Sequence, residues 1–180
     1  YGVLIGGING VLFSYYSEAP FIFMQYFTLT SAMYGFLGII VALASITGAM
    51  LSKRLGSKTK PEKIIVYGLA FMLIGTLLAT LVYFLPISLQ MPTMIVSVFI
   101  ILFGTGTALP NCLSLALIGF QDVVGSAGAI FSLGYYLLVS AIIYGMSVFH
   151  NGTVLAMPLY CLALAVVMLL ISLPLLHKKI

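Results

Sequence analysis

One acidic side chain, Glu18, lies inside a long apolar segment of the chain, where it is placed to take part in chemistry. A carboxylate within a membrane is costly unless it faces a cavity, finds a partner or takes up a proton. A buried Glu18 would therefore suit a proton-coupled site. The alternative is that Glu18 reaches the outer interface and stays hydrated, helped by unwinding of the helix before Pro20.

Polar and aromatic side chains in other apolar segments are candidates for lining a cavity. After residue 125, the side chains of Ser132, Tyr136 and Ser140 share one face of a helix that turns about 100° per residue. Hydroxyls on such a face either line an aqueous cavity or bond backbone carbonyl groups. Aromatic faces and hydroxyls suit loosely specified ligands. We expect a substrate cavity lined by Tyr15, Tyr16, Glu18, Asn111, Ser132 and Tyr136.

Patterns typical of enzymes are missing from the sequence. No GxxxxGKS or GxxxxGKT run provides a phosphate cradle. His150 and His177 fall near opposite ends of the predicted membrane layer, and no acid stands near either of them. We therefore expect His150 to be a solvated loop residue, His177 to be an interfacial residue, and neither to bind a metal. Cys112 and Cys161 are interpreted as small apolar fillers rather than a disulfide. The sequence thus predicts no enzyme, no cofactor and no bound metal.

Six apolar runs must position these side chains, and each has about the 20 residues that a helix needs to cross a bilayer. Apolar residues make up 63% of the chain and charged residues 6%, against about 25% charged in a typical soluble domain. The runs cover residues 2–25, 31–51, 62–85, 93–118, 125–149 and 153–176. Because the connections are short, we expect one all-α membrane bundle.

The basic residues all lie on one side of the predicted membrane layer. Five stand between the second and third runs and two follow the sixth: Lys53, Arg54, Lys58, Lys60, Lys63, Lys178 and Lys179. The positive-inside rule places this side in the cytoplasm. We therefore expect a multi-pass inner-membrane protein with both termini of this segment cytoplasmic. Its basic loop would meet anionic lipid headgroups, not nucleic acid.

A break at residues 86–92 divides the runs into two sets of three, which begin on opposite sides of the membrane. Any repeat is therefore inverted, as in many transporters. Pro20 and Pro110 lie late in the first run of each set, beside polar residues. Paired interruptions of this kind are typical of a site between repeats, although membrane helices also tolerate proline without such a role.

Small residues recur at helical spacing and predict close packing of the helices. They occur at Gly2, Gly6, Gly10, Gly35, Gly38, Ala42, Ser45, Ala49, Gly104, Ala108, Gly125 and Ala129. This pattern predicts a compact bundle and leaves its chemistry open.

Several stretches resemble the second half of a known transporter family. The stretch Phe13–Ile22 is similar to the first helix of the C-terminal half of drug/proton antiporters. These antiporters form the bicyclomycin/chloramphenicol-resistance (Bcr/CflA) branch of the major facilitator superfamily (MFS), in which a step of small residue, Pro and Phe is typical. Leu109–Leu117 and Gly125–Ala129 also fit. The loop residues Lys53, Arg54, Gly56 and Lys58 resemble the weakened second copy of the superfamily's loop motif, with Lys53 in place of an Asp.

This resemblance implies more chain than residues 1–180. Members of the family have twelve helices, and the six runs look like helices seven to twelve, so an N-terminal six-helix half is expected as a partner. A first residue of Tyr1 rather than Met fits this expectation. The first, second, fourth and fifth runs would border the central cavity, with the third and sixth outside. Glu18 departs from the family, which has a small or neutral polar residue there.

The expected function follows from this resemblance. The chain would be the C-terminal half of a proton-coupled multidrug efflux transporter, built from two inverted three-helix repeats. Its partners would be the lipid bilayer, a small amphipathic substrate and the proton as coupling ion. The alternative is a six-helix membrane scaffold or assembly protein that transports nothing and associates through its glycine stripes.

Overall fold

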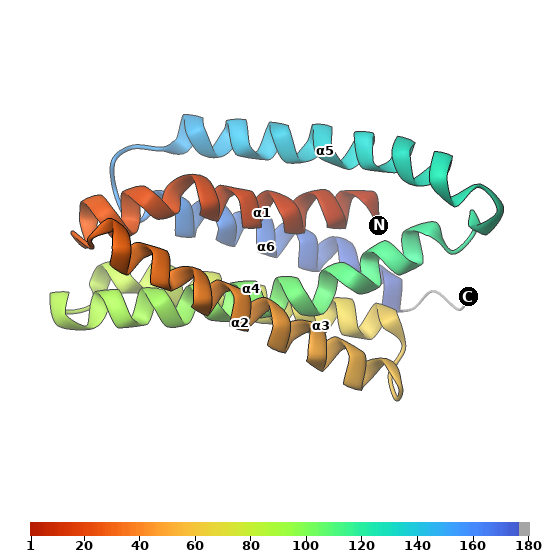
Figure 1. Cartoon of the computed structure of the whole chain (residues 1–180), viewed down its shortest axis with the longest axis horizontal. Helices are drawn as coiled ribbons and strands as arrows, with labels where there is room; N and C mark the ends of the chain where they lie inside the picture. Colours follow the sequence, from red (N-terminus) through yellow and green to blue (C-terminus); the bar gives the residue numbers. More distant parts are fainter. Residues whose placement is uncertain (177–180) are drawn as a thin grey trace.

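The computed structural model describes residues 1–176, and within them the chain folds into a bundle of six α-helices. They are α1 (Gly2–Pro20), α2 (Ser31–Gly56), α3 (Pro61–Leu81), α4 (Ile87–Leu117), α5 (Val124–Phe149) and α6 (Ala156–Ser172). A π-helix, η1 (Phe21–Tyr26), follows α1, and the 3-10 turns η2 (Val82–Phe84), η3 (Gln121–Val123) and η4 (Leu173–Leu176) follow α3, α4 and α6. The helices run along the long axis of the molecule (Figure 1). The expected all-α bundle is confirmed.

Five stretches of residues 1–176 are long and apolar enough to cross a membrane, judged by length and composition. They are Ser31–Gly56, Pro61–Phe84, Ile87–Leu117, Gln121–Phe149 and Ala156–Leu176. The first helix, α1, is not among them, because Asn9, Ser14, Ser17 and Glu18 dilute its apolar residues. It nevertheless runs along the bundle beside α5 and α6 (Figure 1). The helix count therefore agrees with the sequence, and five of the six expected spans have clear spanning character.

The end of α2 and the start of α4 differ from the bounds expected from the sequence. The hydroxyl of Thr30 accepts the Met33 N–H at 3.3 Å and caps α2. At its other end α2 continues to Gly56, past the expected residue 51, with Lys53 and Arg54 in a last turn that favours cations. The fourth helix begins at Ile87 rather than near 93, so the break expected at 86–92 is mostly helical.

Glycines bring the backbones of α3 and α4 into close contact. A Cβ added at Gly68 would lie 2.7 Å from the backbone nitrogen of Ala108 and 2.7 Å from the carbonyl oxygen of Gly104. On the same helix, Gly75 faces the backbone of Ile101 at 2.8 Å. Because only glycine lets the backbones approach this closely, these residues fix the spacing of the two helices.

The other glycine stripes divide into packed and open groups. Gly6 and Gly10 of α1 lie against Leu138 and Ile142 of α5, and Gly7 lies against Met168 of α6. These contacts confirm the close packing expected of α1. The expectation is wrong for three glycines on α2 and α5, which have no neighbouring atom of the described residues within 4 Å of an added Cβ: Gly35, Gly38 and Gly125. Gly128 of α5 is equally open.

Burial is uneven among the helices. Half of the apolar window of α3 is buried, but only 17% of that of α2 and 11% of that of α5. The α5 helix packs along α1, α2 packs along α4, and α3 packs on α6 (Figure 1). The two least buried helices, α2 and α5, therefore leave long apolar and small-residue faces uncovered.

Candidate functional site

The second half of α1 carries the acidic residue singled out in the sequence, and it stays helical through Pro20. Proline has no N–H to continue the α-helical hydrogen bonds. The next turn widens into η1, closed by a bond of 3.0 Å from the Phe27 N–H to the Ile22 carbonyl. Wide turns of this kind occur often at functional sites. The unwinding considered before Pro20 is therefore wrong, and Glu18 is only 6% exposed.

An open groove lies between α1 and α2 beside this segment. Its cavity of about 310 Å³ is lined by Tyr15, Tyr16, Tyr34, Gly35, Leu37, Gly38 and Val41. The ring of Tyr15 is buried and packs 5.5 Å from that of Tyr16, which is half exposed. On the α2 side of the groove, Gly35 and Gly38 have no side chain and so leave the groove open. The groove can receive a small, partly apolar molecule against aromatic faces.

Two of the predicted cavity residues, Tyr15 and Tyr16, meet in this groove, together with Tyr34, which the sequence did not single out. A sequence signal existed for Tyr34, because it precedes Gly35 at the start of the small-residue stripe of α2. The structure thus adds the ring of Tyr34 to the predicted pair of tyrosines that line the groove.

Three further predicted residues, Asn111, Ser132 and Tyr136, lie on α4 and α5, away from the groove lining. The amide of Asn111 donates to the hydroxyl of Ser52 at 2.7 Å and to the carbonyl of Thr107 at 2.9 Å, so it joins α4 to α2. Ser132 is half-buried on α5, and Tyr136 is exposed with its ring 4.5 Å from that of Tyr135. Their role in a larger cavity stays a prediction.

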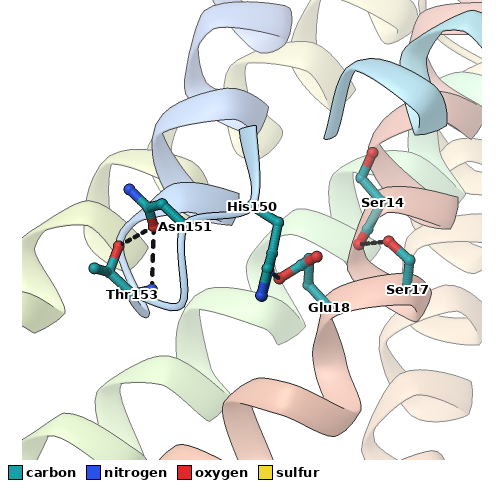
Figure 2. A network of polar contacts seen from close by, with 6 residues as sticks. All are labelled: Ser14, Ser17, Glu18, His150, Asn151 and Thr153. Carbon is teal, nitrogen blue, oxygen red and sulfur yellow. Dashed lines mark hydrogen bonds and ion pairs between the residues drawn. The ribbon is translucent and has the colours of Figure 1, made fainter. Parts of the chain in front are cut away.

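Glu18 contacts a histidine that is distant in sequence. Nδ1 of His150, at the end of α5, lies 2.8 Å from Oε2 of Glu18. Figure 2 shows this contact, together with Ser14 and Ser17, which precede Glu18 on α1. The ring of Phe21 meets the imidazole edge to face at 5.0 Å. His150 is the exposed loop residue that the sequence predicted, but the expectation that no acid stands near it is wrong.

One turn before Glu18, Ser14 is fully buried. Its hydroxyl has no hydrogen-bond partner among residues 1–176, although its carbonyl accepts the hydroxyl of Ser17 at 2.9 Å. A buried hydroxyl without a partner costs free energy. The turn before Glu18 thus holds one buried polar group that the described residues leave unsatisfied.

The basic loop lies at the opposite end of the bundle from the Glu18–His150 contact (Figure 1). Lys53 and Arg54 end α2, Lys58 stands in the following turn, and Lys63 opens α3. The five basic residues that the structure describes therefore lie at one end of the bundle, as the sequence predicted for them. Lys178, Lys179 and His177 lie outside the described residues.

Similar proteins are transporters. No protein-family model matches the chain. It is 31% identical over 174 residues to a protein of Rickettsia felis named "uncharacterized transporter", covering 92% of the chain and 43% of that protein. A second transporter so named, from Rickettsia bellii, is 30% identical over 185 residues, with the same coverage. The MFS-type transporter YdgK of Bacillus subtilis is 26% identical over 142 residues, covering 79% of the chain and 35% of that protein.

These similarities and the apolar helices indicate a multi-pass membrane protein related to transporters. Because the relatives are named as transporters, they support the expectation that the chain is not an enzyme. The chain spans less than half of the length of each of these three relatives.

Proposed function

We propose that residues 1–180 form the C-terminal six-helix half of an MFS transporter that exports small amphipathic molecules in exchange for protons. The observation that carries this proposal is the similarity to an MFS-type transporter over 79% of the chain. Phe13–Ile22 resembles drug/proton antiporters of the Bcr/CflA branch, and this resemblance is the reason for proposing export rather than uptake.

A second six-helix half would cover the faces that this bundle leaves open. The chain spans 43% of its Rickettsia relatives, which leaves length for such a half. The open glycines of α2 and α5 favour the same arrangement, because membrane helices associate over small residues. In this proposal Gly35 and Gly38 of α2, and Gly125 and Gly128 of α5, face the other half across the substrate pathway.

The proposed arrangement in the inner membrane follows from chain direction and charge. The first three helices and the last three would form two inverted repeats, with substrate bound where the repeats meet. Lys53, Arg54, Gly56 and Lys58 would form a cytoplasmic loop against anionic lipid headgroups. Both ends of the segment would then be cytoplasmic, and the Glu18–His150 contact would lie at the outer end.

The substrate would bind against the aromatic groove between α1 and α2. Tyr15, Tyr16 and Tyr34 supply ring faces, which attract apolar surfaces and also cations. Ser132 and Tyr136 on α5 would extend this lining across the cavity once the other half encloses it. Asn111 would support the cavity wall by joining α4 to α2.

Binding of ethidium, a fluorescent amphipathic cation, to the purified full-length protein tests the proposal. We expect saturable binding that weakens in Tyr16→Ala, since this ring lines the groove, and stays unchanged in Tyr144→Ala. Tyr144 is the matched control because it is 72% exposed on α5 and does not line the groove. Saturable binding that is identical in both variants would place the site elsewhere. If no tested amphipathic cation binds at all, the scaffold or assembly function is favoured instead.

A further inference from the structure

The contact between Glu18 and His150 is a polar pair that the aromatic groove does not use. It ties the end of α1 to the connection between α5 and α6 (Figure 2). The Glu18 side chain is 8% exposed and that of His150 is 38% exposed. The pair therefore has one buried member and one member that water reaches.

The geometry fixes where a proton can be added. While Glu18 is ionised it only accepts hydrogen bonds, and the 2.8 Å contact then requires a hydrogen on Nδ1 of His150. In the neutral ring Nε2 is then the nitrogen that accepts a proton. A proton from water forms an N–H bond there, the Nδ1–H bond to Oε2 remains, and release returns the proton to water. Phe21 packs edge to face against the ring and holds its orientation.

Adding one proton to the Glu18–His150 pair is electrostatically favourable. With His150 neutral, the pair carries one buried negative charge, and one added proton leaves it without net charge. An unpaired charge in a low-dielectric setting is costly, whereas a neutral ion pair costs less. Among residues 1–176 the other charges are remote, because Glu62 at the start of α3, Asp122 in η3 and the basic loop lie at the opposite end of the bundle (Figure 1).

The other titratable groups around the pair are a thiol and phenols, which are already protonated at ordinary pH and so do not take up a further proton. On α6, Cys161 is a fully buried thiol, and the Tyr160 hydroxyl donates to the carbonyl of Ile142 at 2.8 Å. On α1 itself, Tyr15 and Tyr16 are phenols. Histidine is the side chain whose charge ordinarily changes between pH 5 and 8.

We propose that Glu18 and His150 form a proton-binding site that is loaded through His150 from the end of the bundle opposite the basic loop, and that this site carries the coupling proton of the transporter. The second part rests on the proposed transport function. An exporter that exchanges substrate for protons must take up its proton from the outer side. The positive-inside rule makes the end opposite the basic loop the outer one.

Nuclear magnetic resonance of the full-length protein, labelled with carbon-13 at histidine Cε1, tests proton binding directly. The His150 signal is assigned by its loss in His150→Asn, which keeps a donor near the Nδ1 position. We expect protonation of the ring to shift this signal as the pH is lowered, and we expect Glu18→Gln to change the pH dependence of that shift, because it removes the carboxylate that lies 2.8 Å from Nδ1. His177→Gln, which removes the other histidine of this chain, should leave it unchanged. A His150 signal that does not titrate, or that titrates identically in Glu18→Gln, overturns the proposal.

Transport by the same variants tests the coupling role. In proteoliposomes, Glu18→Gln and His150→Asn are expected to lose ethidium flux driven by a pH gradient but to keep exchange of ethidium at equal pH. Exchange shows that the variants are folded. Gradient-driven flux at the wild-type level in both variants overturns the coupling role. If the wild-type protein shows no gradient-driven flux, the proposed function fails with the coupling role, while the titration still decides whether the pair binds a proton.

Discussion

The contact between α3 and α4 can be tested by adding one methyl group, in the variant Gly68→Ala. The new Cβ would lie 2.7 Å from the Gly104 carbonyl oxygen and the Ala108 nitrogen, while ordinary contacts begin at 3.4 Å. Both atoms belong to the backbone, so no side chain can turn away, and the helices must separate by about 0.7 Å. A gap of 0.5–1 Å forfeits roughly a quarter to a half of each van der Waals contact along the seam.

Overpacking of this kind costs about 1–3 kcal/mol of unfolding free energy. The measurement is reversible unfolding in mixed micelles with increasing SDS, followed by circular dichroism. Gly134→Ala on α5 is the matched control, because nothing among the described residues lies within 4 Å of its added Cβ. Its stability should be unchanged or rise by up to about 1 kcal/mol, as alanine favours helix. Equal stabilities of the two variants would refute the close approach of α3 and α4.

Three further predictions concern topology and two buried polar groups. Cysteine labelling at Ser57 and at Asn151 should occur from opposite sides of the membrane, and labelling of both from one side would contradict the topology. Asn111→Ala should lower the unfolding free energy by about 1 kcal/mol, because it leaves the hydroxyl of Ser52 without its 2.7 Å donor. An unchanged stability would show that this bond contributes nothing. Ser14→Ala should raise stability by about 1 kcal/mol, since it removes a buried hydroxyl that lacks a partner among residues 1–176. Lower stability would mean that water or another group satisfies Ser14.

The helices were predictable because each apolar run has the length that a bilayer requires, and this property is local. The aromatic pair Tyr15 and Tyr16 was also predictable, since both stand on one segment beside Glu18. The predicted helix bounds were less accurate where a proline lies within an apolar run, because proline can either end a helix or be accommodated in it. At the start of α4, Pro92 suggested a break, yet the helix continues through it.

Contacts between distant segments could not be read from the sequence. His150 and Glu18 are 132 positions apart, and only the packing of α5 along α1 brings them within 2.8 Å. Glycine spacing is equally ambiguous, because the same pattern serves contacts inside a bundle and contacts with something outside it. The stripe on α1 is packed, whereas Gly35 and Gly38 on α2 face open space.

The most direct test compares the full-length protein with residues 1–180 alone in proteoliposomes that carry a pH gradient and ethidium. If this bundle is half of a proton-coupled exporter, the full-length protein should move ethidium against its gradient, and collapsing the pH gradient should stop the movement. Residues 1–180 alone should show none, because alternating access needs a second bundle to close the site. Robust gradient-driven flux by residues 1–180 alone, or none by the full-length protein, would contradict the account.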